Sequence, residues 1–384
     1  MARTCLCSCF EPRPLRPTWK AWRPLGSTSA WSGSTPRRRV PEILLPAPNP
    51  GAATILALHG GGYLGYFSAC VAAALQMRRE TLRAAGPLSR SFDAICGTSV
   101  GAILAAGIAT NTSPRDILDL MSAKGGAIFP RRRYFANWPG IFTSRFDPHP
   151  LHGLLTDILG PVRLGEVDRV LVIPAVNETL GRPVIFRSSD PEHWDIPLVD
   201  VVMASAAAPL YFPLHRIGGE RYTDGGLVAN GPALIASADL FRRFGIGTRR
   251  QRVVSIGTTR TAPRSIVTKG KHDRWGGVRW IWGGGRLQQL VMGGQEDLQS
   301  ELLAVLGPAG RLHLDMELST ADAEKVHMVK ADAEAREVLG AAAASCVAEI
   351  SPDERGFLDR ILTRRSRDMA WRRGPGGRPV AVLV

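Results

Sequence analysis

The chain has 384 residues, of which 45% are hydrophobic and 7% aromatic, the composition of an ordinary globular protein with a large core. Its formal charge of +14 would suit a nucleic-acid partner, but residues 1–48 hold eight basic and two acidic side chains, and residues 363–384 hold six and one. Because most of the charge lies at the two ends, we expect no groove for a nucleic acid duplex.

The first 50 residues are rich in Pro, Arg, Ser and Trp and show no helical or strand periodicity. They predict a disordered basic tail over 1–50; a transit peptide or a start codon placed too far upstream would also explain them. No apolar run reaches 18 residues and the N-terminus lacks the core of a secretory signal, so a cytoplasmic protein is expected. Six cysteines in a chain of this length predict no disulfide framework.

From Ala53 onward, short apolar runs alternate with glycine turns and longer helical patterns. The sequence predicts a strand over 53–58, a helix over 66–83, a strand over 91–96 and a helix over 100–110. This order predicts an α/β fold with a parallel-rich central sheet and helices on both faces, in three layers.

The remainder of the chain continues the mixture of strands and helices. Residues 169–189 predict two strands around a turn, and residues 199–208 a short buried helix. Further strands are expected over 252–258 and 312–318. Residues 319–348 are rich in Ala and Glu and predict helix. No internal repeat and no clear second domain are found.

The first glycine-rich stretch, HGGG at 59–62 followed by Gly65, fits three kinds of site. The glycines match a dinucleotide-binding turn, the HGGG oxyanion loop of some esterases, and a GGGxxG loop that turns backbone N–H groups toward an oxyanion. A dinucleotide fold needs an acidic residue about 20 positions onward, at the end of the second strand. Glu80 is near that spacing but lies in the predicted helix, which argues against a dinucleotide site.

The second stretch, GTSVGA at 97–102, places Ser99 between a predicted strand and a predicted helix. A serine on such a turn exposes its hydroxyl, and the N-terminus of the following helix favours developing negative charge. The alternative is a serine that only caps the helix. An HGGG esterase would also need a histidine in a loop after a strand, and His272, His313 and His327 are not in such a loop.

Two further stretches complete the pattern: ASAAAPLYFP at 204–213 and DGGLVANGP at 224–232. With GGGxxG and GTSVGA, in this order, they resemble the patatin-like phospholipases over about residues 52–320. The resemblance implies a patatin-like fold, Ser99 as the nucleophile and Asp224 as the general base. It also implies an oxyanion hole at Gly60, Gly61 and Gly62, with Gly65, Gly97, Gly101, Gly225 and Gly226 as further motif glycines.

The resemblance also suggests how the chain is divided. Residues 52–320 are expected to form the hydrolase domain, 321–362 a C-terminal helical extension, and 363–384 a flexible basic tail. Two positions depart from the family pattern. Leu64 stands where the family usually has Arg or Lys, and His59 where it often has Asp or Ser. The lost charge at Leu64 predicts reduced or altered activity.

The predicted function is hydrolysis of carboxylic esters of membrane lipids by a Ser–Asp dyad through an acyl-enzyme, with no cofactor or metal. Phospholipids or acylglycerols are the expected substrates. Peripheral contact with a membrane is expected through the Trp- and Arg-rich residues 274–286 and the basic ends. Two alternatives stay open: an HGGG-type Ser-His-Asp esterase, and a patatin-fold module that binds lipid or regulates with little activity.

Overall fold

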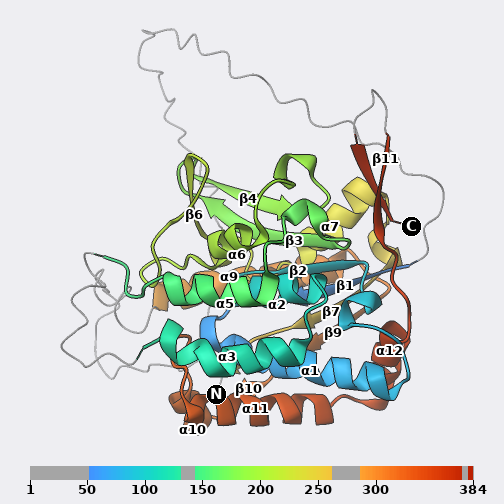
Figure 1. The fold of residues 1–384 in the computed structure, drawn as a ribbon. Helices are drawn as coiled ribbons and strands as arrows, with labels where there is room; N and C mark the ends of the chain where they lie inside the picture. The colour runs from blue at the N-terminus through green and yellow to red at the C-terminus, as the bar shows by residue number, and fades with distance from the viewer. Residues whose placement is uncertain (1–51, 131–142, 262–285, 374–378, 384) are drawn as a thin grey trace, which may run out of the picture. The chain divides into compact units, whose positions relative to one another are not determined.

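The structure, a computed structural model, describes residues 52–130, 143–261, 286–373 and 379–383 (Figure 1). The predicted tail over 1–50, His272 and residues 274–285 of the Trp-rich segment lie outside the described residues. Among the described helices, none has both the length and the apolar character needed to cross a bilayer.

A mixed, mostly parallel sheet forms the centre, in the order β5-β6-β3-β2-β1-β7-β9, with β4 paired to β3. Neighbours from β3 through β2, β1 and β7 to β9 are parallel, whereas β4, β5 and β6 pair antiparallel. The strands are β1 Ala53–Leu58, β2 Ala94–Gly97, β3 Val170–Asn177, β4 Arg182–Arg187, β5 His215–Ile217, β6 Glu220–Asp224, β7 Gln251–Ile256 and β9 Gly310–Leu314. Two small sheets pair β8 Arg260–Thr261 with β10 Glu317–Leu318, and β11 Met369–Arg373 with β12 Pro379–Leu383.

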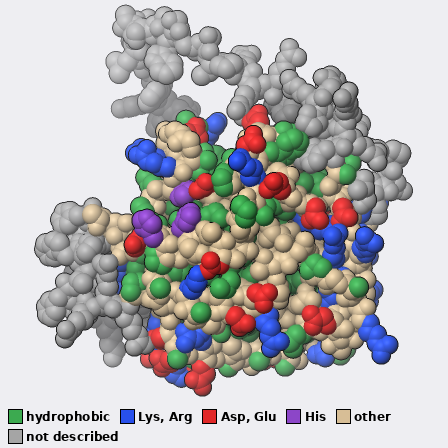
Figure 2. Space-filling model, viewed as in Figure 1, with side chains coloured by type: hydrophobic (Ala, Val, Ile, Leu, Met, Phe, Trp, Pro, Cys, Tyr) green, Lys and Arg blue, Asp and Glu red, His purple; other side chains and the backbone are tan. Residues whose placement is uncertain are grey.

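Helices cover both faces of the central sheet. They are α1 Gly65–Thr81, α2 Val100–Ala109, α3 Pro114–Ile128, α5 His149–Leu159, α6 Leu198–Ala206, α7 Ala233–Phe244, α9 Arg286–Val305, α10 Thr320–Lys325, α11 Ala333–Ala348 and α12 Pro352–Leu362. Figure 1 shows α1, α3 and α11 below the sheet and α7 above it. On the face drawn in Figure 2, acidic and basic side chains are intermixed over the lower helices.

The alternation of side chains along β1 explains the three layers. Leu56 and Leu58 pack with the larger group of helices, which includes α1, α2 and α6. Ile55 and Ala57 point to the opposite face and pack with α7 and α9. Because successive side chains of a strand point to opposite faces, a fully apolar strand such as β1 must be covered on both. The predicted three-layer α/β/α fold is confirmed.

Two sequence predictions are altered by contacts that lie far apart in the chain. The strand predicted over 312–318 is broken between β9 and β10, where Asp315 accepts hydrogen bonds from the Thr259 and Met316 N–H groups. The helix predicted over 319–348 is interrupted between α10 and α11. There Met328 accepts a hydrogen bond from Tyr63 N–H at 2.7 Å, which helical backbone could not provide.

The segment 363–384 differs from the loose tail that its composition predicts. Arg364 and Arg367 form ion pairs at 2.7 and 3.2 Å with the carboxylate of Asp93, whose side chain is fully buried. Strands β11 and β12 then pair as an antiparallel hairpin. A buried carboxylate without a cation nearby would be costly. The two arginines therefore supply the positive charge that Asp93 requires.

Candidate active site

Ser99 lies at the turn between β2 and α2. Its backbone angles are φ 54° and ψ −122°, and holding a non-glycine residue in such a rare conformation costs roughly 1–3 kcal/mol. A Cβ atom at Gly97 would collide with the carbonyl oxygen of Gly101. The two glycines therefore let the strand turn directly into the helix, which presents the Ser99 side chain at the end of the sheet.

The Ser99 hydroxyl donates a hydrogen bond to Asp224 Oδ2 at 2.7 Å. Asp224 is the last residue of β6, and the Gly226 N–H donates to its other carboxylate oxygen at 2.6 Å. Only 8% of Ser99 and 5% of Asp224 is exposed. The fold thus brings together a hydroxyl and a carboxylate that are 125 residues apart in sequence.

The surroundings of Asp224 make it a stronger proton acceptor than an exposed carboxylate. Burial raises the pKa of Asp224 to about 6, although hydrogen bonds from the Gly226 N–H and the Ser99 hydroxyl act to lower it. A general base works best when its pKa lies near the working pH. At neutral pH Asp224 is therefore ionised and still basic enough to accept a proton from a serine.

Helix α6 and its end position the two partners. The Ser205 hydroxyl accepts a hydrogen bond from Ser99 N–H at 3.1 Å and donates one to Pro174 O at 2.7 Å. The Asp224 N–H donates to Ala207 O at 3.0 Å. The ASAAAP stretch is thus the support to which both Ser99 and Asp224 are attached. Sequence reasoning used this stretch as a family signature and missed the role of Ser205.

The glycine loop that follows β1 lies beside Ser99. Gly60 N–H donates to Asn230 O at 3.1 Å, so this amide, which the resemblance assigns to the oxyanion hole, is already engaged. Gly62 has φ 58°, and a Cβ there would collide with the carbonyl oxygen of Met328. Gly62 lines the same pocket as Ser99 and Asp224, so this part of the loop faces the reacting groups.

An apolar pocket of about 740 Å³, its open mouth included, is lined in part by Ser99 and Asp224. Helices α2, α3 and α5 and the residue after α3 supply much of its wall, with the side chains of Ile103, Met121, Ile128, Phe129, Leu151 and Leu154. Gln288 and Met292 of α9 line it as well, as do Met328 and Val329. The last two lie beyond residue 320, so the segment predicted to be a C-terminal extension contributes to the site.

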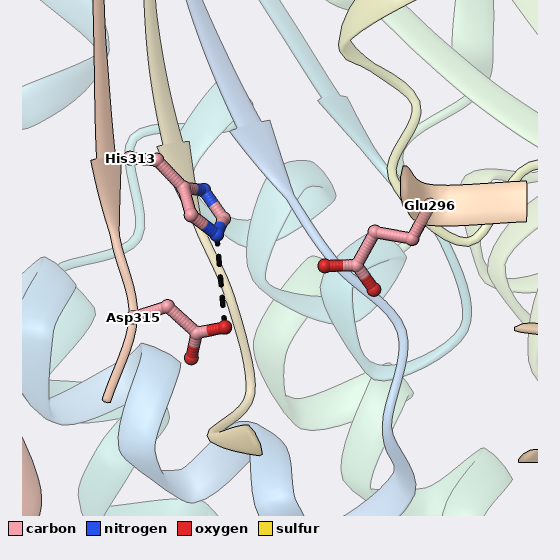
Figure 3. Close-up of side chains that lie close together, drawn as sticks. All are labelled: Glu296, His313 and Asp315. Atoms are coloured by element: carbon pink, nitrogen blue, oxygen red, sulfur yellow. Dashed lines mark ion pairs between the residues drawn. The ribbon is translucent and has the colours of Figure 1, made fainter. Parts of the chain in front are cut away.

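A polar cluster beside the loop includes three side chains with the spacing of a metal site. Glu296, His313 and Asp315 each place a ligand atom within 4.8 Å of the others (Figure 3). However, the Arg260 guanidinium donates to both Glu296 and Asp315 at 3.2 Å. Because this guanidinium already neutralises the carboxylates, we assign the cluster a structural role.

That role is to connect α9 with the loops around Ser99. Glu296 forms an ion pair with His59 Nδ1 at 2.9 Å and accepts a hydrogen bond from Asn230 Nδ2 at 3.1 Å. Burial raises the pKa of Glu296, but hydrogen bonds from His59 and Asn230 and the charges of His59 and Arg260 outweigh it and bring the pKa to about 2. Glu296 is therefore ionised throughout the physiological range.

The histidines that an HGGG esterase would need have other contacts. His59 is paired with Glu296, and His313 lies 3.6 Å from Asp315. His327 is exposed, and its Nδ1 accepts a hydrogen bond from the Val329 N–H at 3.4 Å. Within the described part of the chain, the hydroxyl of Ser99 is hydrogen-bonded to a carboxylate and not to an imidazole. The geometry favours the Ser–Asp interpretation.

Comparisons with known proteins agree with the motifs. The model of the family "Patatin-like phospholipase" matches residues 56–237. The chain is 34% identical over 259 residues to a "cGAMP-activated phospholipase" of Pseudomonas aeruginosa. The match spans 65% of this chain and 74% of that protein. The chain is 30% identical over 269 residues to an Escherichia coli protein of the same description, with the same two shares covered. A third relative, "Patatin-like protein 1" of Oryza sativa, is 28% identical over 274 residues, and the match spans 62% of this chain and 66% of the rice protein.

Proposed function

This chain belongs to the patatin-like phospholipase family, and on that premise we propose that Ser99 and Asp224 are its catalytic dyad. Membership makes the chain a lipid acyl hydrolase of the serine-hydrolase class. The observation that carries the proposal is the 2.7 Å hydrogen bond between the Ser99 hydroxyl and a buried carboxylate in the lining of an apolar pocket. Nucleophile and base within hydrogen-bond reach are what nucleophilic catalysis requires.

The reaction proceeds in two halves. In the first, Ser99 Oγ attacks the ester carbonyl carbon while its proton passes to Asp224 Oδ2. The tetrahedral intermediate then releases the alcohol, which takes that proton, and an acyl-enzyme is left on Ser99. In the second half, water gives a proton to Asp224 and attacks the acyl group. The fatty acid leaves as Ser99 recovers its proton, and the dyad is restored.

Backbone amides hold the oxyanion in this scheme. We assign that role to Gly61 and Gly62, because the Gly60 amide is committed to Asn230 O. One such donor is typically worth about 3–4 kcal/mol of transition-state stabilisation. The half-buried Leu64 side chain packs against the core, and Leu64 is not among the residues that line the pocket. Reduced or altered activity from the missing charge at this position stays a prediction.

The pocket fits the acyl chain of a lipid. Its wall is mostly apolar and includes Ser99 and Asp224, so an acyl chain inside it can bring its ester carbonyl to the dyad. We propose phospholipids as the substrates and a lipid surface as the place where the protein meets them. The tryptophans from which the sequence predicts membrane contact, at 275, 280 and 282, lie outside the described residues.

Hydrolysis of a medium-chain p-nitrophenyl ester and of phosphatidylcholine tests the dyad, with and without cGAMP, which the names of the bacterial relatives give as activator. We expect Ser99→Ala and Asp224→Asn each to lower kcat by about 10³-fold or more. A matched control exists on the surface, where the Ser319 hydroxyl donates to Asp322 Oδ2 at 2.8 Å. Ser319→Ala and Asp322→Asn should leave kcat unchanged. Activity that survives Asp224→Asn would move the base to a histidine and revive the HGGG interpretation.

A further inference from the structure

Over residues 295–299, helix α9 is polar on the side that faces the protein, whereas Leu303 near its end is buried in the core. The Gln295 side chain donates to Leu227 O, and Gln299 Nε2 donates to Val228 O at 3.1 Å. Between them, Glu296 contacts His59 and Asn230. All of these partners lie in the two loops that carry the dyad base and the oxyanion glycines. A helix on the surface of a globular protein normally turns its apolar stripe inward, so α9 is reversed over these turns.

The outward side of α9 is apolar. Of twelve large hydrophobic side chains exposed in the described residues, seven lie between 287 and 306, so they are concentrated on this one helix and its end. These seven are Leu287, Leu290, Val291, Leu298, Leu302, Val305 and Leu306. At about 100° per residue, those from Leu287 to Val305 fall within roughly one third of the helix circumference.

Exposure along this stripe is high. Leu298 is 56% and Val305 84% exposed, although leucine and valine are normally among the most buried residue types. Scattered apolar residues need no explanation, but a contiguous stripe of this length marks a surface that binds something. Glu301 is the charged residue at the same angular positions, so the stripe carries little charge of its own.

The stripe begins at the substrate pocket. Gln288 and Met292, from the first turns of α9, line the pocket together with Ser99 and Asp224. Leu287 and Val291 are their immediate neighbours along the chain and point outward. The apolar stripe and the apolar pocket are therefore two sides of the same helix end, and a surface that covers the stripe lies next to the dyad.

We propose that the outward face of α9 is the surface by which this protein lies on a lipid bilayer. The inference rests on the proposed function, since it takes the lipid surface as the source of the acyl chain. A helix that is polar toward the protein and apolar toward the outside matches a helix lying in the membrane interface. Docked in this way, α9 lies between the bilayer and the pocket that Gln288 and Met292 line.

The charges on α9 indicate whether docking needs anionic lipid in the bilayer. Its sequence contains one basic residue, Arg286, against Glu296, Asp297 and Glu301. Attraction to anionic lipid therefore contributes little here, and docking depends on burial of apolar side chains. The α9 face should therefore bind vesicles of pure phosphatidylcholine. Binding should not weaken when the salt concentration is raised from 0.1 to 0.5 M, a change chosen because the added salt would screen any electrostatic contribution.

Flotation of the full chain with phosphatidylcholine vesicles tests the inference, using Ser99→Ala protein so that no lipid is consumed. Adding Leu298→Glu and Leu302→Glu should lower the vesicle partition coefficient at least tenfold at both salt concentrations. The matched control adds Met77→Glu and Leu180→Glu, two exposed apolar residues outside α9, and should leave partition within twofold. Circular dichroism checks that both variants are folded.

Three results would overturn the inference. One is that the Leu298/Leu302 variant binds vesicles as tightly as its Ser99→Ala parent, and another is that the parent does not bind at all. The third is that the parent sediments as a dimer which the variant turns into a monomer, because the stripe would then be an interface between two copies. Whether the wild-type protein hydrolyses esters tests the proposed dyad and not the docking face. Vesicle binding by a chain whose wild type hydrolyses no ester would contradict the proposed dyad and leave the docking face in place.

Discussion

The Ser99 hydroxyl donates to Asp224 Oδ2 at 2.7 Å in a site from which water is largely excluded. A dyad of this kind has a weaker base than a serine–histidine pair, because an unperturbed aspartate has a pKa near 3.9. Here burial raises the pKa of Asp224 to about 6. The same burial that makes Asp224 a useful base also makes its ionised form costly to the stability of the fold. Activity and stability should therefore depend on pH in opposite directions.

Activity should depend on the ionised form of Asp224. We expect kcat/KM for a p-nitrophenyl ester to rise with pH through an apparent pKa of about 6 and then to level off. A histidine base would inflect in the same range, so the profile should be repeated at two temperatures. The ionisation enthalpy of a carboxyl group is small, whereas an imidazole pKa falls clearly on warming. An inflection that moves down with temperature would contradict Asp224 as the base.

Stability should change in the opposite direction. Since the folded pKa of Asp224 lies above its unfolded value, its bound proton stabilises the fold fully below about pH 4, and this stabilisation is lost as pH rises through about 6. Asp224→Asn should therefore raise the free energy of unfolding by up to about 3 kcal/mol at pH 8, and by little at pH 4. Urea denaturation of both proteins at the two pH values measures this. A variant that is less stable than wild type at pH 8 would refute the assigned burial effect.

The parts of the fold that sequence predicted are those with strong local signals. The strand over 53–58 appears as β1 with those bounds, and the helix over 100–110 appears as α2. The hairpin over 169–189 appears as β3 and β4, with Gly181 at φ 61° in the turn. Apolar runs, helical spacing and turn glycines act over a few residues, so a single sequence contains enough information to locate them.

What sequence missed depends on contacts between distant segments. The bond from Tyr63 N–H to Met328 O breaks a helix that composition favours. The sequence analysis predicts no element over 286–305, where α9 lies, and hydrophobic periodicity alone cannot show that the apolar side of this helix faces outward. For the site, the motifs located Ser99 and Asp224, but they did not reveal that the Gly60 amide is committed to Asn230 O or that Ser205 supports Ser99. Those facts require three-dimensional neighbours.

The oxyanion loop should not tolerate a side chain at Gly62. Gly62→Ala would place a Cβ at φ 58° against Met328 O, so the loop must shift and its amides move away from the oxyanion. We expect kcat to fall by about 10²–10³-fold with a smaller change in KM. Gly340→Ala is the matched control, because a Cβ at Gly340 meets no atom within 4 Å and should leave kcat as it is. Steady-state kinetics of the two variants decide the matter, and equal kcat values would remove Gly62 from the oxyanion hole.

The C-terminal segment should stabilise the fold through Asp93. Burial disfavours the charged form, yet Arg367 and Arg364 hold the pKa of Asp93 below its usual range. Replacing both arginines by Met leaves the buried carboxylate with its hydrogen bonds from Thr54 and the backbone N–H at 367 but without a cation, which should cost about 3–5 kcal/mol of unfolding free energy at pH 7. Adding Asp93→Asn to that variant removes the stranded charge and should recover a large part of the loss. Urea denaturation of the single, double and triple variants forms the cycle. A loss below about 1 kcal/mol for the double variant would place 363–367 outside the stable fold, as composition alone predicts.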